Sequence, residues 1–327
     1  MADRSPVIGD FVSANAQVLS IGGFLLAMFI LFSAVTDTFF TAGNILNLLR
    51  QAAPMITVAV AMTLVIITGG IDLSVGSTVA LVNALAAIAL GTALPWPIVA
   101  VGLLLLGALI GSAQGWFITH EGIPAFIVTL AGMSMLRGVA LLLTQGFSIP
   151  ISAQSDFVLL GRGWVLGVPL PVIIATIVGI AGMVVLGATR FGRYIVAIGA
   201  NREAARRSGI AINRVTLATY ALTGAAAAVA GLIIAARLGS GSSNAAVGFE
   251  LEVIAAVGLG GTSLMGGRGS IVGTVLGALT IAVIGNGLIL AHVSPFFTQI
   301  ITGAIILGAI WLNIRVFFRS GKVLRKA

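Results

Sequence analysis

The residues best suited to chemistry form the segment Gly69-Gly70-Ile71-Asp72-Leu73-Ser74-Val75-Gly76, which stands between two long apolar runs. A carboxylate such as that of Asp72 is costly in a membrane interior and generally marks a functional site. The glycines beside it are typical of a helix that is interrupted where it lines a cavity. Asp72 could contact substrate hydroxyls, relay protons, or fix a hinge by capping the first-turn amides of the helix that follows.

A second glycine-rich segment, Gly260-Gly261-Thr262-Ser263-Leu264-Met265-Gly266-Gly267, repeats the first at a constant offset of 191 and is identical to it at four of eight positions. Such pairs in two halves of a transporter point to the substrate path. Because the chain holds 43 glycines, chance identity is the alternative. The residues predicted to form the substrate path or its hinge are Gly69, Gly70, Asp72, Ser74, Gly76, Asn83, Gly260, Gly261 and Ser263.

Four polar residues, Asn83 among them, lie inside apolar runs. The amides of Asn83, Gln114 and Asn286 could line a polar passage, but each one singly is better explained as an interhelical hydrogen bond, worth about 0.6 kcal/mol on average in a membrane. Arg137 must extend to the interface, face water or pair with an acid.

A short exposed helix is predicted between two spanning helices, within 199–214. Asn201 is a suitable N-cap and Glu203 falls in the first turn, where the helix dipole favours an acid. Gly209 is a good terminator. The helix is either an amphipathic connector held by lipid headgroups or a docking element for a cytoplasmic partner. The residues assigned to it are Asn201, Glu203, Ala204, Ala205, Arg206, Arg207 and Gly209.

Composition excludes most other classes of protein. The chain is 59% hydrophobic and 8% charged, whereas soluble domains carry about 25% charged residues. Its apolar runs are continuous, which indicates an all-α polytopic membrane protein rather than a β-barrel. The net charge of +8 is concentrated at the ends of these runs, as topology signals are, so no nucleic acid is expected as a partner.

Chemical signatures are missing from the sequence. It has no cysteine, and its two histidines, His120 and His292, lack metal-ligand spacing, so no metal site is predicted. It contains no phosphate-binding loop of the Walker type and no hydrolase signature, so the chain is predicted not to be an enzyme.

Ten spans are predicted, with the second or third a possible half-helix and the eighth possibly re-entrant. Basic residues in 189–214 and after 314 place both termini in the cytoplasm. The chain then divides into an N-terminal segment (1–17), one membrane domain (18–314) and a basic tail (315–327). The predicted spans are 18–36, 52–69, 73–91, 98–119, 124–145, 171–188, 215–236, 251–265, 270–291 and 296–314.

Three motifs resemble one known family. Residues 69–77, residues 123–130 followed by Arg137-Gly138, and residues 259–267 are similar to segments of the ribose-type permeases of bacterial ABC sugar importers. The resemblance runs from about residue 45 to 312. Glu203-Ala-Ala also resembles the start of the EAA loop through which importer permeases engage their ATPase, although the downstream Ile-x-Leu-Pro part is absent. Ala125 stands where the family often has proline.

The resemblance implies a type II importer-like fold and a permease domain in the bacterial inner membrane. Two permeases, copies or paralogues, would flank one path for a monosaccharide or polyol. A separate cytoplasmic ATPase carrying ATP and Mg²⁺ would dock on 199–214, and a periplasmic sugar-binding protein would dock outside. The chain itself is expected to bind no cofactor. An ion-coupled secondary carrier, with Asp72 or the pair Glu250/Glu252 as coupling acid, is the alternative, followed by a passive channel.

Overall fold

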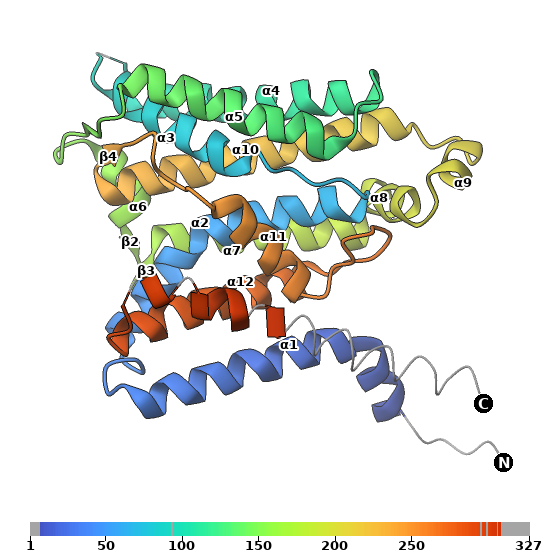
Figure 1. Cartoon of the computed structure of the whole chain (residues 1–327), viewed down its shortest axis with the longest axis horizontal. Helices are drawn as coiled ribbons and strands as arrows, with labels where there is room; N and C mark the ends of the chain where they lie inside the picture. The colour runs from blue at the N-terminus through green and yellow to red at the C-terminus, as the bar shows by residue number, and fades with distance from the viewer. Residues whose placement is uncertain (1–6, 93, 295, 299, 306, 309–327) are drawn as a thin grey trace.

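The computed structural model describes residues 7–92, 94–294, 296–298, 300–305 and 307–308, and shows a bundle of roughly parallel and antiparallel helices (Figure 1). Among these residues, seven helices are long and apolar enough to cross a membrane. They are α1 (Val7–Val35), α2 (Ala42–Ile67), α4 (Trp96–Thr119), α5 (Ala125–Thr144), α7 (Leu170–Ala188), α10 (Ile212–Leu238) and α12 (Ile271–Leu290).

Two predicted spans, the third and the eighth, are short helices. Residues 73–91 form α3 (Val75–Leu90), with 16 residues, and 251–265 overlap α11 (Phe249–Leu259), with 11 residues. Glycine-rich turns at 68–74 and 260–270 interrupt the chain there, so neither helix reaches the roughly 20 residues that a span needs. The predicted span 296–314 and the tail 315–327 lie partly or wholly outside the described residues, which include a short apolar helix within Phe296–Ile305.

The loop predicted at 189–214 is itself helical. It holds α8 (Arg190–Ala200) and α9 (Arg202–Arg207), and α9 lies at one extreme end of the bundle (Figure 1). The N-terminal segment predicted at 1–17 also differs, because α1 already begins at Val7.

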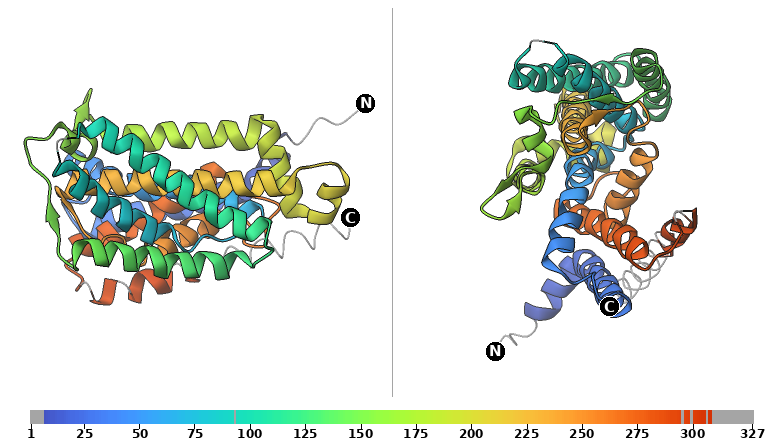
Figure 2. Two further views of the ribbon diagram at one scale, coloured as in Figure 1. Left: turned by 90° about the horizontal axis from the view of Figure 1, so that it is seen from above. Right: turned by 90° about the vertical axis from the view of Figure 1, so that its left-hand side faces the viewer.

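Two central helices, α2 and α10, are buried along most of their length. Both consist largely of small and β-branched residues, which let neighbouring backbones approach. The helices α4, α5 and α7 surround them and expose Leu, Ile and Val side chains outward. In Figure 2, α7 and α5 lie on opposite faces of the molecule.

Contacts between α4 and α10 depend on glycine. The series Gly107, Gly111 and Gly115 lets the two helices pack closely. A Cβ added to Gly107 or Gly111 would collide with the backbone of α10, at Gly224 and Tyr220 respectively. In the same way Gly273 and Gly277 of α12 face Gly260 and Ala256 of α11.

Short elements close the end of the bundle opposite α9. Strand β1 (Ile149–Pro150) pairs antiparallel with β4 (Ser240–Gly241), with Ile149 opposite Gly241. Strands β2 (Trp164–Val165) and β3 (Val168–Pro169) form a hairpin. Between β1 and β2 in the chain, a 3₁₀ turn, η1 (Asp156–Val158), leads into α6 (Leu159–Arg162).

The substitution Gly111→Ala tests the packing of α4 on α10. The added methyl group has no room, so we expect unfolding to become easier by about 1–3 kcal/mol, measured by thermal unfolding in detergent. Gly102→Ala is the matched control, because Gly102 lies in the same helix with no atom within 4 Å of an added Cβ. It should be neutral or slightly stabilising, as glycine is a poor helix former. Equal effects of the two substitutions would contradict this packing.

Candidate functional site

The first interruption of the bundle begins where α2 ends. Gly69 takes a left-handed conformation with φ of 84°, and the N–H of Gly70 bonds back to the carbonyl of Val65 at 3.1 Å. This is the Schellman pattern, which requires glycine or asparagine at the left-handed position. The chain then runs without regular structure to Ser74, from which α3 starts.

Asp72 is 2% exposed and fixes this interruption. Its Oδ1 accepts hydrogen bonds from the backbone N–H of Ser74 at 2.9 Å and from the Ser74 hydroxyl at 2.7 Å. Ser74 is the residue that precedes α3, so Asp72 forms a turn ahead of the helix. It does not bond the first-turn amides, as the capping alternative had supposed.

Three neighbouring helices hold the same segment. The side-chain amide of Gln114 in α4 donates to the Ser74 hydroxyl oxygen at 2.9 Å. The backbone carbonyl of Ile71, which lies outside any helix, accepts from the Thr129 hydroxyl of α5 at 3.2 Å and from the Tyr220 hydroxyl of α10 at 3.5 Å. Helices α4, α5 and α10 are therefore all tied to the interruption between α2 and α3.

The second interruption starts at the end of α11 with the same backbone pattern. Gly261 has φ of 86°, and the N–H of Thr262 bonds to the carbonyl of Val257 at 3.3 Å. Gly261 therefore corresponds to Gly69, an offset of 192 rather than the 191 at which the sequences match. The chain continues to Ser270 before α12 begins, whereas α3 begins soon after the first turn.

The two interruptions touch each other. The N–H of Gly267 donates to the carbonyl of Ile67, the last residue of α2, at 2.9 Å. Gly199 of α8 packs on the same atoms, and a Cβ added to it would collide with the Ile67 carbonyl and the Gly267 nitrogen. We call Ile67, Gly199 and Gly267 the backbone junction. It joins α8 to both interrupted helices without any intervening side chain.

Helix α9 follows directly and has the predicted caps. The Asn201 side chain accepts from the N–H of Ala204 at 2.9 Å, and Gly209 ends the helix with φ of 79°. Ala205 is buried, while the other side chains of α9 are exposed. The only described ion pairs join Glu203 to Arg206 at 2.9 Å and to Arg207 at 3.0 Å.

These pairs keep Glu203 charged. Hydrogen bonds from Arg207 and Arg206 hold the pKa of Glu203 below its usual range. The stabilising pairs are therefore fully formed at neutral pH and are lost only as the pH falls through that lowered pKa.

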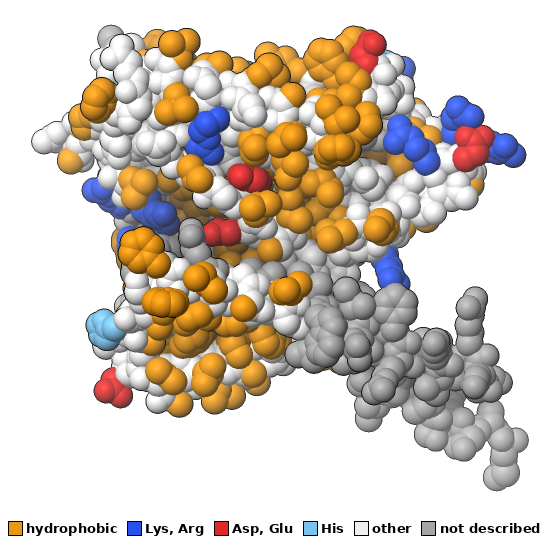
Figure 3. All heavy atoms as spheres, in the orientation of Figure 1, with side chains coloured by type: hydrophobic (Ala, Val, Ile, Leu, Met, Phe, Trp, Pro, Cys, Tyr) orange, Lys and Arg blue, Asp and Glu red, His pale blue; other side chains and the backbone are white. Residues whose placement is uncertain are grey.

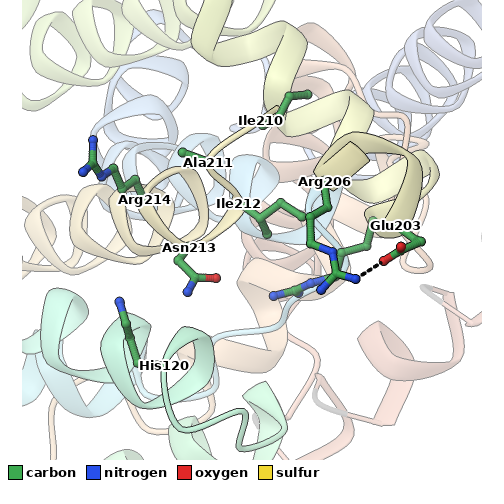
Figure 4. Close-up of a pocket in the computed structure, with 9 residues that line it drawn as sticks. His120, Glu203, Arg206, Ile210, Ala211, Ile212, Asn213 and Arg214 are labelled. Carbon is green, nitrogen blue, oxygen red and sulfur yellow. Dashed lines mark ion pairs between the residues drawn. The ribbon is translucent and has the colours of Figure 1, made fainter. Parts of the chain in front are cut away.

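A cleft of about 730 Å³ lies beside α9 (Figure 4). His120, at the end of α4, lies across it from Asn213, and its ring stacks on Trp116. Three arginines and one glutamate line the cleft. The glutamate is already paired with Arg206, so the walls carry a net positive charge. The lining residues are His120, Arg202, Glu203, Arg206, Ile210, Ala211, Ile212, Asn213 and Arg214.

The remaining polar residues bond between elements. Asn83 accepts from the N–H of Ser242 at 2.6 Å and lies away from the interruption, near the closed end. Asn286 of α12 exchanges hydrogen bonds with Asn44 of α2 at 2.9 and 3.1 Å. The backbone carbonyl of Ser263 accepts from the N–H of Gly266 at 2.9 Å within the second interruption.

Sequence reasoning missed several residues of this site. Gly199, Thr129, Tyr220 and His120 had not been assigned to the substrate path or to the docking helix. No local signal marks Gly199 among 43 glycines. Tyr220 is one of only two tyrosines in the chain, and a phenol within an apolar run requires a hydrogen-bond partner, so that signal was available.

Comparison with known proteins identifies the family. Residues 44–310 match the family described as branched-chain amino acid transport system / permease component, and the chain belongs to it. It is therefore a multi-pass membrane protein of the permease class. No solved structure matches the chain significantly.

Three curated relatives cover almost all of the chain. The ribose import permease RbsC of Escherichia coli K12 is 43% identical over 88% of this chain and 91% of its own length. RbsC of Haemophilus influenzae is 41% identical over 93% and 94%. The xylose transport system permease XylH of Escherichia coli K12 is 37% identical over 94% and 95%.

Substitution of Asp72 separates its structural role from proton chemistry. In Asp72→Asn the side-chain oxygen still accepts both hydrogen bonds, so stability and uptake should stay near those of the parent protein. Asp72→Ala leaves the Ser74 N–H unpaired and should lower stability by about 1–3 kcal/mol. Thermal unfolding and uptake are measured together. Loss of uptake in a stable Asp72→Asn protein would show that the acid itself is needed.

Gly199→Ala probes the backbone junction. The methyl group would have to displace backbone atoms of two other segments, so we expect a loss of about 1–3 kcal/mol in stability and strongly reduced uptake. Gly187→Ala is the control, because an added Cβ there meets no atom within 4 Å. If Gly199→Ala unfolds and transports like Gly187→Ala, the junction is not the tight contact described here.

Proposed function

We propose that this chain is the permease subunit of an ATP-driven importer in the bacterial inner membrane, and that it carries a monosaccharide or related polyol. Family membership and relatives named for ribose and xylose import support the class and the substrate. The observation that carries the mechanism is the backbone junction, through which an exposed, capped helix is joined to both interrupted helices.

The proposed assembly has four kinds of component. A cytoplasmic ATPase binds ATP and Mg²⁺ and docks at α9 and the cleft beside it, while this chain binds no cofactor. A second permease, a copy or a paralogue, completes the path. A periplasmic sugar-binding protein delivers the substrate at the opposite end, where β1–β4 close the bundle.

The mechanism follows from the contacts of α8. When the ATPases close, α9 and α8 move as one body, because Asn201 caps α9 directly after α8 ends. Gly199 then shifts Ile67 and Gly267 together, since backbone contacts leave no side chain to absorb the movement. The segments 68–74 and 260–270 are the hinges about which α3 and α12 tilt.

The proposed topology has ten membrane segments with both termini in the cytoplasm and two related halves. The seven long helices supply most of it. The pairs α2–α3 and α11–α12 are the equivalent parts, supported by the shared Schellman turns at Gly69 and Gly261. The short α3 and α11 are half-helices: α3 starts inside the bundle after the junction, whereas α11 starts inside the bundle after β4 and ends at the 260–270 segment beside the junction.

An ion-coupled carrier that uses Asp72 is the competing function. It is less well supported, because both described hydrogen bonds to Asp72 come from Ser74 within the same turn. It also leaves the capped, projecting α9 without a role. Such a carrier would transport in liposomes as a single chain under an ion gradient.

Affinity purification from native membranes tests the importer. The parent chain should recover an ATPase with a phosphate-binding loop. Glu203→Lys, which reverses the charge that pairs with Arg206 and Arg207, should lose it and abolish uptake while staying in the membrane. Gly209→Pro should do the same, because proline cannot adopt the left-handed conformation observed there.

Asp156→Lys is the matched control. Asp156 is exposed at the opposite end of the bundle, so this charge reversal should leave ATPase recovery unchanged. If both Glu203→Lys and Gly209→Pro retained the ATPase and uptake, docking at this site would be refuted.

A further inference from the structure

Arg137 occupies an unusual depth in the bundle. It is the thirteenth of the 20 residues of α5, which places it about 10 Å from the nearer end of the helix. Its guanidinium donates to the carbonyls of Ser243 at 2.6 Å, Ala245 at 2.8 Å and Ala246 at 3.4 Å. The arginine therefore fixes, well inside the bundle, the segment that leads into α11.

Two carboxylates follow in the first turn of α11. Glu250 packs on the first turn of α3, and its carboxylate occupies the space that a Cβ on Gly76 would need. Among the described residues, its Oε2 is buried without a hydrogen-bond partner. Glu252 is exposed, as are Leu251 (64%) and Val247 (73%). We call the surface formed by Arg137, Val247, Glu250, Leu251 and Glu252 the charged face.

This face differs from the other sides of the bundle. Figure 3 shows acidic side chains near α11, with basic side chains and hydrophobic patches around them. On the opposite face, seen in Figure 2, α7 exposes Ile177, Ile180 and Met183. Aliphatic side chains are favoured in hydrocarbon. Carboxylates are strongly disfavoured there, and those that occur inside membrane proteins are found beside water-filled cavities.

We infer that the charged face lines the water-filled passage for the sugar, and that the second permease completes this passage. The inference rests on the proposed function and adds the residues that meet the substrate. Arg137 is occupied by backbone carbonyls and Glu250 Oε2 is buried against α3, so the group left open for a ligand is the exposed carboxylate of Glu252, whose oxygens only accept hydrogen bonds. They suit the hydroxyl donors of a neutral polyol and repel anions.

Single cysteines provide the test, because the chain has none of its own. Glu252→Cys and Leu251→Cys are placed in the full chain, in native membranes, and treated with a charged, membrane-impermeant thiol reagent applied to both sides of opened vesicles. Ile177→Cys on α7 is the control for lipid contact. The reactive thiolate is disfavoured in hydrocarbon, so both charged-face cysteines should react about a hundredfold faster than the control.

Each result decides the inference separately from the proposed function, since labelling needs no transport. Slow labelling of both charged-face cysteines, equal to that of Ile177→Cys, would overturn it whether the face meets lipid or a dry subunit contact. The ligand is tested by Glu252→Gln in the parent chain. Sugar uptake should fall about tenfold with ATPase recovery intact, because the amide oxygen still accepts a hydrogen bond but loses the charge that strengthens it. Unchanged uptake would exclude this carboxylate as a substrate ligand.

Discussion

The structure depends on pairing the backbone groups that are left free where α2 ends inside the protein. Hydrocarbon offers them no hydrogen bond, so an interrupted helix is tolerated only where other elements supply donors. The Ile67 carbonyl is paired by the N–H of Gly267, and the Ile71 carbonyl by hydroxyls of Thr129 and Tyr220. The interruption exists only while α5, α10 and the 260–270 segment are in place. It is therefore a junction of the whole bundle rather than a local loop.

That requirement also determines how movement can spread. A contact between side chains can yield by a change of rotamer, but Gly199, Ile67 and Gly267 meet through their backbones. Displacement of one must displace the others or break the hydrogen bond. The turns beside them, at Gly69 and Gly261, are where the chain can change direction with least resistance. Rigid contact and flexible turn lie within a few residues of each other, which is the arrangement expected of a hinge.

Local signals in the sequence predicted the long apolar helices, the capped helix α9 and the positions of both interruptions. They could not give the partners of Ile71, because a hydroxyl 58 or 149 residues away leaves no mark near it. The offset of 191 was one residue wrong for a physical reason. Sequence identity aligned Gly70 with Gly261. By backbone conformation, however, the residue equivalent to Gly261 is Gly69, because both are left-handed. Helix α8 was missed because the six arginines of 189–214 marked the whole segment as a basic loop, although only two of them lie in α8.

The acids of the bundle lie both in and beside the interrupted segments. The hinge segments contain a single acid, Asp72, and its described hydrogen bonds are internal to its own turn. Three further charges, Arg137, Glu250 and Glu252, lie on α5 and at the start of α11. Gly76 connects the two regions, since Glu250 packs directly on the first turn of α3. A tilt of α3 about 68–74 would therefore move the surface against which Glu250 rests, so that a displacement of Gly199 would reach Glu250 through α3.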